Sequence, residues 1–518
     1  MNQLKTWIAL AVAAICLSPF SSSAAGTIVL NSQSSGPTPF IAILNISVSG
    51  TAALDHIDFK VYPKPGSLTR PVCARYSAAY IQSRGYTDLT TGQIRLPVFG
   101  LYSNYGNTVA LVAGFADNTT KRLNVSVQTP VWTDPTAGAV FLNPTVAQAR
   151  SASTNLSYDF ILLKTFAAAI TPVIIDTDGQ VRWVGTAGIA TQSALLFENG
   201  IYISDGGAGM IRMEFDGSYR TVANFSGYTD PVYGPMHITY TGHHQFDYGK
   251  YGIIIDCNTS EWTECVNIEV DGQGNVLHAW NLATSVTNAM TAGGDGSYVS
   301  DLVRPASTDW FHNNAVTYRP SDDTMIFSSR ENYVVATDYT TGAIKWIFGD
   351  PAKKWYAGPP LPATYQYNSL RQLALTATGS TLAPIGQHGV SIYRDKLLLH
   401  DNGTASITNP PNSPAGISRS YSALRKYEIN AHPPTTNAGS ATEIWTYDAG
   451  QTIKSAYCSS VYEDGSESYL GTFSNSNPTI VFGLDPSGAK VFDYRYPTLN
   501  FCGTSWNSNP IHLENLRF

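Results

Sequence analysis

One pattern returns six times in this 518-residue chain and constrains its fold more than any other feature. In most copies an apolar run leads into an Asp, a Gly follows within four residues, and an apolar and aromatic stretch comes next. Asp and Gly satisfy a tight turn and the flanking residues alternate, so each copy predicts a β-hairpin. The copies are VIIDTDGQVRWVG at Asp176, RMEFDGSYRTV at Asp216, IEVDGQGNVLHAW at Asp271, VATDYTTGAIKW at Asp338, a degenerate copy with a long insertion around Tyr427, and FGLDPSGAKVFDY at Asp485.

The spacing of the copies indicates how the hairpins are assembled. The first four lie 40, 55 and 67 residues apart. Periods of about 40 residues and more, with several strands each, are typical of β-propellers. A set of unrelated hairpins is the simpler alternative, but six copies favour the propeller. We therefore expect an all-β chain with a six-bladed β-propeller over residues 131–518.

The chain before the repeats has two parts. Residues 26–130 alternate apolar and polar residues, as in LNVSVQTPVW, and predict a small N-terminal β-sandwich that ends near Thr129. Residues 1–25 combine Lys5, a short apolar run and the small residues SSSAAG, which indicates a cleaved secretory signal peptide. No later window has eighteen uninterrupted apolar residues, so we expect no membrane anchor and a periplasmic or secreted protein.

Charge and cysteine content narrow the function further. The formal net charge is −7 and 13% of residues are charged, with no basic tract, so nucleic acid is not an expected partner. Cys257 and Cys265 bracket a hairpin tip and predict a local disulfide, and Cys458 and Cys502 predict a second one. Cys73 then remains as a buried thiol. No CxxC or HxxxH spacing occurs, so we expect no zinc site, and no other metal or cofactor is predicted.

Three strands that begin with histidine lie between the hairpins: HQFDYGKYGIIIDC at His244, HNNAVTYRPSDDTMIFSSR at His312 and HGVSIYRDKLLLHDN at His388. The innermost strands of a propeller line one channel, so these three histidines are expected to meet at one mouth of it. His244 is chosen over His243 because its distance to the next apolar strand matches that of His388.

Two further residues join this group. Asn314 lies two residues beyond His312 on the same strand face, and Arg330 ends the following strand. One histidine on a strand is usually structural, but three in register with an amide and a guanidinium favour a site. No carboxylate has a comparable position, which argues against glycoside hydrolysis. The set suits a tetrahedral oxyanion, and a neutral imidazole among these donors is a candidate nucleophile or base.

These residues resemble the bacterial arylsulfate sulfotransferase family. The resemblance rests on DWFHNN, SSR, TGAIKW, GHH, GQHG and LLLHDNG, covers roughly residues 139–518, and is most specific from His243 to Asn402. The resemblance implies a six-bladed propeller that transfers a sulfuryl group from a phenolic sulfate donor to a phenolic acceptor. It also implies a sulfohistidine intermediate and no need for a nucleotide sulfate.

The resemblance implies a role for each residue that matches a family motif. The histidine of GQHG, His388, would be the nucleophile. His312, Asn314 and Arg330 would hold the sulfuryl oxygens, and His244 or His312 would protonate the leaving phenolate. This chain departs from the family at Gln245, where an acidic residue is expected after the histidine pair. A homodimer through the N-terminal domain is implied only weakly, because that third of the chain matches poorly.

Two other readings stay open. Residues 336–346, ATDYTTGAIKW, fit the tryptophan-docking pattern of quinoprotein dehydrogenase propellers. Those proteins generally have eight blades, repeat the motif, and bind calcium and a quinone, whereas the full pattern occurs here once. The second alternative is a non-catalytic ligand-binding propeller, for example for glycans.

Overall fold

The computed structural model describes residues 26–50, 52–88, 92–152, 155–305, 308–357, 368–408, 414–431, 438–465 and 467–518. The predicted signal peptide, residues 1–25, lies outside them. The fold is all-β, as predicted, and its helices are short. Among the described residues, no helix combines the length and the hydrophobicity needed to cross a membrane.

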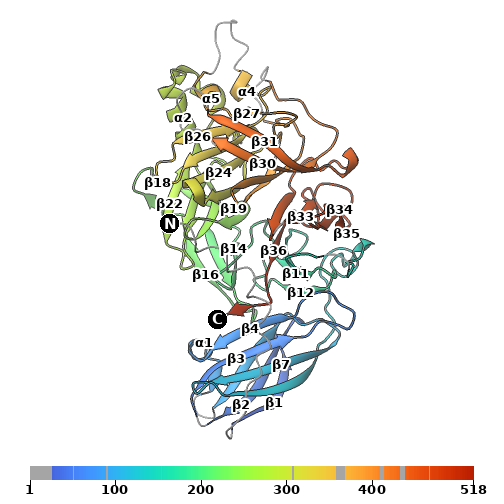
Figure 1. Ribbon diagram of the computed structural model, residues 1–518. Coiled ribbons are helices and arrows are strands. Elements are labelled where there is room, and N and C mark those ends of the chain that lie inside the picture. The colour runs from blue at the N-terminus through green and yellow to red at the C-terminus, as the bar shows by residue number, and fades with distance from the viewer. Residues whose placement is uncertain are drawn as a thin grey trace, which may run out of the picture.

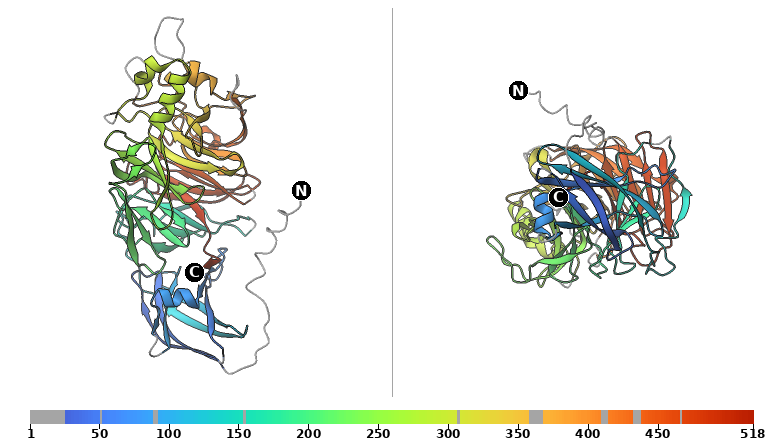
Figure 2. Two further views of the ribbon diagram at one scale, coloured as in Figure 1. Left: turned by 90° about the vertical axis from the view of Figure 1, so that its left-hand side faces the viewer. Right: turned by 90° about the horizontal axis from the view of Figure 1, so that it is seen from below.

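Two sheets form the N-terminal part, which lies at one end of the molecule (Figures 1 and 2). The first contains β1 (Thr27–Ser35), β2 (Ile41–Ser49), β6 (Gln93–Phe99) and β5 (Thr87–Asp88). The second contains β37 (Leu516–Arg517), β4 (Val72–Ser77), β3 (Leu54–Val61), β7 (Gly106–Phe115) and β8 (Thr120–Gln128). This part also contains helix α1 (Ala78–Ser83).

The core of the N-terminal part continues into the rest of the chain. Leu44 of the first sheet and Leu111 of the second share a buried cluster with Trp183 and Phe215. The rings of Phe99 and Phe215 stack with centroids 4.4 Å apart. Burial of aromatic area of this kind contributes strongly to stability, so the two parts are expected to unfold together.

Six further antiparallel sheets follow along the chain, each with four main strands. In the order in which the strands pair, the first three are β36 (Asn507–Ile511), β10 (Phe160–Lys164), β11 (Val173–Asp176) and β12 (Val181–Val184); β13 (Leu195–Phe197), β14 (Gly200–Ser204), β15 (Gly209–Met213) and β16 (Tyr219–Asn224); and β19 (Ile238–Tyr248), β20 (Ile253–Thr259), β21 (Val266–Val270) and β22 (Val276–Asn281).

The remaining three are β23 (Asn313–Arg319), β24 (Thr324–Ser329), β25 (Val334–Asp338) and β26 (Ile344–Phe348); β28 (His388–Tyr393), β29 (Lys396–Asp401), β30 (Ala423–Ala431) and β31 (Gly439–Tyr447), to which β27 (Thr376–Ala377) is added; and β32 (Ser460–Asp464), β33 (Ser468–Phe473), β34 (Thr479–Leu484) and β35 (Lys490–Tyr496), extended by β9 (Thr145–Gln148). Shorter elements connect successive sheets along the chain. They are a two-stranded ribbon of β17 (Thr229–Asp230) and β18 (Gly234–Pro235), and helices α2 (Leu282–Ala292), α3 (Val299–Leu302), α4 (Lys354–Ala357) and α5 (Asn368–Gln372).

The hairpins predicted from the six sequence copies are confirmed. Each copy joins the third and fourth strands of one sheet. At Asp271 the carboxylate accepts hydrogen bonds from the backbone N–H groups of Gln273 and Asn275, at 2.9 and 2.8 Å. Gly274 has a φ of 86°, a conformation that favours glycine. The Asp and Gly therefore form the turn that holds the two outer strands in register.

One edge strand of each of several successive sheets contacts the edge strand of the next. β19 contacts β23, β23 contacts β28, β28 contacts β32, and β32 contacts β36. Segments from the two ends of this region complete two sheets. β36 pairs with β10 to finish the first sheet, and β9 pairs with β35 to extend the last.

One of the two predicted disulfides is confirmed and the other is wrong. Cys458 and Cys502 form a disulfide, whereas Cys257 and Cys265 are buried free thiols. Cys257 lies opposite Val266 in the β20–β21 ladder, and Cys265 is the neighbour of Val266. Because neighbouring residues point to opposite faces of a strand, Cys257 and Cys265 pack into two different apolar clusters.

Candidate functional site

A β-bulge lies at or beside each predicted site histidine. On β19, residues 242–245 stand opposite the single residue Asp256, whose carboxylate accepts a hydrogen bond of 3.0 Å from the backbone N–H of His244. On β23 the extra residue is Asn314, and on β28 residues 389 and 390 oppose one residue of β29. Bulges re-aim side chains and are common beside active sites. They explain why polar residues interrupt three otherwise regular strands.

His388 is held in one orientation by Asn402. Its Nδ1 lies 2.8 Å from Oδ1 of Asn402 and 3.1 Å from the carbonyl oxygen of Gly386. Asn402 donates from Nδ2 to the carbonyl oxygens of Ser455 and Cys458, at 2.7 and 3.0 Å, which turns its oxygen toward the ring. Both neighbours of Nδ1 are acceptors, so Nδ1 carries the hydrogen and Nε2 carries the lone pair.

The surroundings of His388 keep its ring neutral. Burial, followed by His244, His312 and Arg330, holds the pKa of His388 well below its ordinary value of 6.5. The side chain is 1% exposed. Among the described residues, both hydrogen bonds of the His388 ring are made by Nδ1 and none by Nε2. The site therefore contains a neutral imidazole with a free lone pair, which is the form in which histidine acts as a nucleophile.

His244 and His312 form a close pair beside this ring. Their Nε2 atoms lie 3.0 Å apart, and the His244 ring centroid is 5.9 Å from that of His388. Burial and then His243 lower the pKa of His244 to about 3, so His244 is neutral. One nitrogen of such a contact must donate and the other accept, so His312 is the donor.

Two carboxylates that the sequence analysis did not place in the site determine the charge of His312. Its Nδ1 lies 2.9 Å from Oε2 of Glu264 and forms a closer contact with Asp309. Burial lowers the pKa of His312, but Glu264 and Asp309 outweigh burial and raise it to about 9. His312 is therefore an imidazolium at neutral pH. The prediction that no carboxylate accompanies the histidines is wrong.

The backbone is strained at His312 and at its ion-pair partner Glu264. His312 has a φ of 52° and Glu264 a φ of 48°, in the left-handed region that residues with a Cβ rarely adopt. The backbone N–H of Asn313 donates to the carbonyl oxygen of Glu264 at 2.8 Å, which joins the two segments. Such strain costs about 1–3 kcal/mol per residue and clusters at active sites and ligand clamps.

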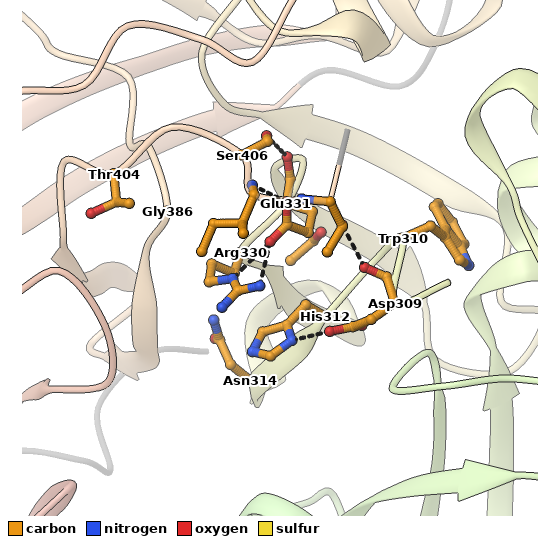
Figure 3. A network of polar contacts seen from close by, with 12 residues as sticks. Asp309, Trp310, His312, Asn314, Arg330, Glu331, Gly386, Thr404 and Ser406 are labelled. Atoms are coloured by element: carbon orange, nitrogen blue, oxygen red, sulfur yellow. Dashed lines mark hydrogen bonds and ion pairs between the residues drawn. The ribbon is translucent and has the colours of Figure 1, made fainter. Parts of the chain in front are cut away.

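Arg330 lies between the His312 strand and the next sheet (Figure 3). Its guanidinium pairs with Glu331 at 2.5 Å, and its backbone N–H donates to the carbonyl oxygen of His312 at 3.1 Å. Asn314 donates from Nδ2 to the carbonyl oxygen of Gln387 at 2.7 Å, next to His388. Figure 3 shows Asn314 and His312 pointing toward the guanidinium. These groups form a cluster of hydrogen-bond donors of the kind that suits an oxyanion.

The structure thus brings together all five predicted residues: His244, His312, Asn314, Arg330 and His388. It also adds residues that were missed. Asp309 could have been found, because it stands three residues before His312 in the DWFHNN motif. Asn402, in the LLLHDNG motif, could have been found in the same way, whereas Glu264 carries no such signal, since it comes from a hairpin between two strands.

Two overlapping groups have the spacing of metal ligands: His243, His244 and Glu264, and Glu264, Asp309 and His312. In each group the ligand atoms lie within 4.8 Å of one another. The carboxylates already pair with imidazole rings, with His243 Nδ1 3.0 Å from Glu264 Oε1. We assign these groups as histidine–carboxylate pairs.

Comparison with solved structures gives only distant likenesses. The β-propeller domain of Cps50 (Swd1) from Myceliophteria thermophila is 10% identical over 68% of this chain and 88% of that domain, with a TM-score of 0.34. The computationally designed Ika8 protein is 8% identical over 75% and 93%, with a TM-score of 0.28. A europium-containing methanol dehydrogenase is 9% identical over 77% of each chain, with a TM-score of 0.32. TM-scores this low support no conclusion about this chain.

Comparison of the sequence with known families is more specific. None of the curated proteins compared with the chain matches it. The family model described as Arylsulfotransferase (ASST) matches residues 145–481, which include the five predicted residues together with Glu264, Asp309 and Asn402. A match of this extent, over the sheets that build the site, shows that the chain belongs to the arylsulfotransferase (ASST) family.

Proposed function

We propose that this protein is an arylsulfate sulfotransferase that moves a sulfuryl group from a phenolic sulfate to a second phenol, through a sulfohistidine and without a nucleotide sulfate. Membership of the family supports a sulfotransferase with phenolic substrates. The observation that carries the mechanism is the free Nε2 lone pair of His388 among groups that donate hydrogen bonds. This combination serves nucleophilic attack on an anionic ester better than it serves binding alone.

In the first half-reaction, Nε2 of His388 attacks the sulfur of the aryl sulfate. The N–S bond forms as the bond between sulfur and the phenolic oxygen breaks. Arg330 and Asn314 donate to the sulfuryl oxygens, and the His312 imidazolium adds its positive charge, while the loose transition state expected for such transfers spreads charge over the sulfuryl and leaving oxygens. The positive charges that depress the pKa of His388 are the same ones that stabilise this anion.

The His244–His312 pair manages the proton. A phenol has a pKa of about 10, so its phenolate leaves more readily when it is protonated. His312 is the protonated ring, and His244 accepts its hydrogen bond at 3.0 Å. The pair gives its proton to the departing oxygen. In the second half-reaction an acceptor phenol returns a proton to the pair, its oxygen attacks sulfur, the N–S bond breaks, and His388 is restored.

The wider architecture belongs to the same proposal. The six sheets are the blades of a six-bladed β-propeller, residues 131–518, and the two N-terminal sheets are a β-sandwich, residues 26–130. The contacts between edge strands of successive sheets support this arrangement. Residues 1–25 are a signal peptide that exports the protein to the periplasm or the medium, where the Cys458–Cys502 disulfide is stable. The family resemblance further implies a homodimer that forms through this sandwich.

The test is a two-substrate assay with a chromogenic aryl sulfate, with and without a phenol. Wild-type protein should release the chromogenic phenol much faster when the acceptor is present, and His388→Ala should release none while it remains folded. Acid-labile, base-stable sulfate on His388 after donor alone should be detected by mass spectrometry. Full turnover by His388→Ala would refute the mechanism. Binding of aryl sulfates without turnover would support a binding propeller, and quinone absorbance would support a dehydrogenase.

A further inference from the structure

An aromatic rim extends from the buried histidines to the surface. It consists of Trp506, the Cys458–Cys502 disulfide, Tyr457 and Phe501. The disulfide, Trp506 and Tyr457 form one apolar cluster. Trp506 is at its inner end, with its ring centroid 5.4 Å from that of His244. Phe501 is at its outer end, where it stacks on Tyr457 with centroids 4.8 Å apart.

The middle of the rim lies against the proposed sulfuryl site. The guanidinium carbon of Arg330 is 5.9 Å from the centroid of the Tyr457 ring. Tyr457 is half-buried, and Phe501 is 64% exposed. Phe501 stacks on Tyr457, so the two rings together offer adjacent aromatic surface. A ligand whose anionic group reached Arg330 would therefore have its apolar part beside these two rings.

The rim is rigid, and it is connected to the proposed nucleophile. The residues after Tyr457 have left-handed backbone conformations, with φ values of 57° at Cys458 and 83° at Ser459. The disulfide, a hydrogen bond of 3.0 Å from Asn402 to the carbonyl oxygen of Cys458, and one of 2.9 Å from the N–H of Ser459 to Trp506 hold this strain. Strained backbone that is fixed from several sides is typical of ligand clamps. Asn402 also orients His388.

We propose that Tyr457 and Phe501 form the wall against which the aryl ring of the substrate lies. The inference rests on the proposed function and names its specificity determinant. Stacking depends little on which substituents the aryl ring of the substrate carries, so this wall accepts many phenols. A larger ring system covers more of the Phe501 ring. The enzyme is therefore expected to prefer fused or extended phenols, such as 2-naphthol, over single-ring phenols.

The experiment measures 2-naphthol and phenol with wild type, Phe501→Ala, Phe501→Trp and Tyr251→Ala. Tyr251 is the matched control because it is 66% exposed and lies on the loop before β20. Loss of one aromatic partner should raise the KM and the Kd for 2-naphthol about tenfold. The kcat should stay within about twofold, because the ring acts before the chemical step. Phe501→Trp keeps an aromatic ring at this position, so it should keep the wild-type KM and Kd. Tyr251→Ala should leave both constants unchanged.

The outcomes separate this inference from the proposed function. The Kd for 2-naphthol is measured by calorimetry, which needs no turnover. An unchanged Kd in Phe501→Ala, or an equal loss in Tyr251→Ala, would overturn the aryl wall while leaving transfer through His388 intact. Tight binding of 2-naphthol that depends on Phe501, in a protein without transferase activity, would support the wall and overturn the proposed function instead.

Discussion

Glu264→Gln tests whether a buried carboxylate keeps His312 protonated. The substitution preserves the size of the side chain and removes its charge. Glu264 is 4% exposed and lies 2.9 Å from Nδ1 of His312. The pKa of His312 is raised from 6.5 to about 9, which corresponds to about 3 kcal/mol in favour of the protonated ring. Asp309 shares this effect, so loss of Glu264 alone should lower that pKa by about 1–2 pH units.

The pH dependence follows from the direction of the shift. The pKa of His312 is higher in the folded than in the unfolded protein, so its stabilising contribution is complete below about pH 6.5. That contribution is lost as the pH rises through about 9. The histidines hold the pKa of Glu264 well below 4.5 in spite of its burial, so the pair also weakens in acid. Transfer activity should decline above pH 9 in wild type and at least one pH unit earlier in Glu264→Gln.

The assay is kcat/KM for a chromogenic aryl sulfate with saturating phenol from pH 6 to 10.5, accompanied by an NMR titration of the histidine rings. Glu261→Gln is the matched control. Glu261 lies on the same hairpin and pairs with His237 at 2.7 Å, but both side chains are about half exposed. The control should leave the decline of kcat/KM at alkaline pH unchanged. If Glu264→Gln folds normally and also keeps the wild-type limb and His312 titration, the carboxylate does not set the charge of His312.

Four other predictions follow from the site and the fold. Asn402→Ala should lower kcat about 100-fold with little change in KM, because a freely turning His388 is misaligned for attack; kcat within twofold of wild type would refute this. Alkylation of the unfolded, unreduced protein should label Cys257 and Cys265, whereas Cys458 and Cys502 should be labelled only after reduction, as peptide mass spectrometry would establish. Incubation with EDTA should leave transfer unchanged, since histidines already pair with the carboxylates, and recovery of lost activity by added zinc would contradict that assignment. Truncation after Trp506 should destabilise the whole protein by several kcal/mol in chemical denaturation, because it removes β36 and β37.

The sequence predicted the parts of the fold that depend on local chemistry. The Asp and Gly turns and the alternation around them are local, and the six outer hairpins lie where the copies of the pattern predicted them. The pairing of β36 with β10 could not be predicted in this way, because more than 300 residues separate the two strands and neither carries a motif. The incorrect disulfide has a similar cause. Spacing brought Cys257 and Cys265 close in the chain, but strand alternation placed them on opposite faces.

The site residues in repeated strand patterns could be predicted from the sequence, whereas a residue that a loop brings to the site could not. His244, His312 and His388 stand in similar sequence patterns, which one sequence can reveal, although only β28 begins at its histidine: β19 begins at Ile238 and β23 begins just after His312. Glu264 acts through a contact between different sheets, which no pattern in the sequence marks, whereas Asn402 contacts His388 within one sheet and lies in the LLLHDNG motif. The carboxylate missed in this way changes the chemistry most, since it converts a neutral donor into an acid.

The two strands at residues 507–517 have a consequence for how the protein matures. β36 completes the first of the six sheets and β37 adds to an N-terminal sheet, where Leu516 enters the core. These residues leave the ribosome after all the strands that they complete. An emerging chain therefore exposes an unpaired edge of β10 until residues 507–511 have been made, and such edges promote aggregation. A chain interrupted before these residues can close neither part, so its sheet edges stay exposed.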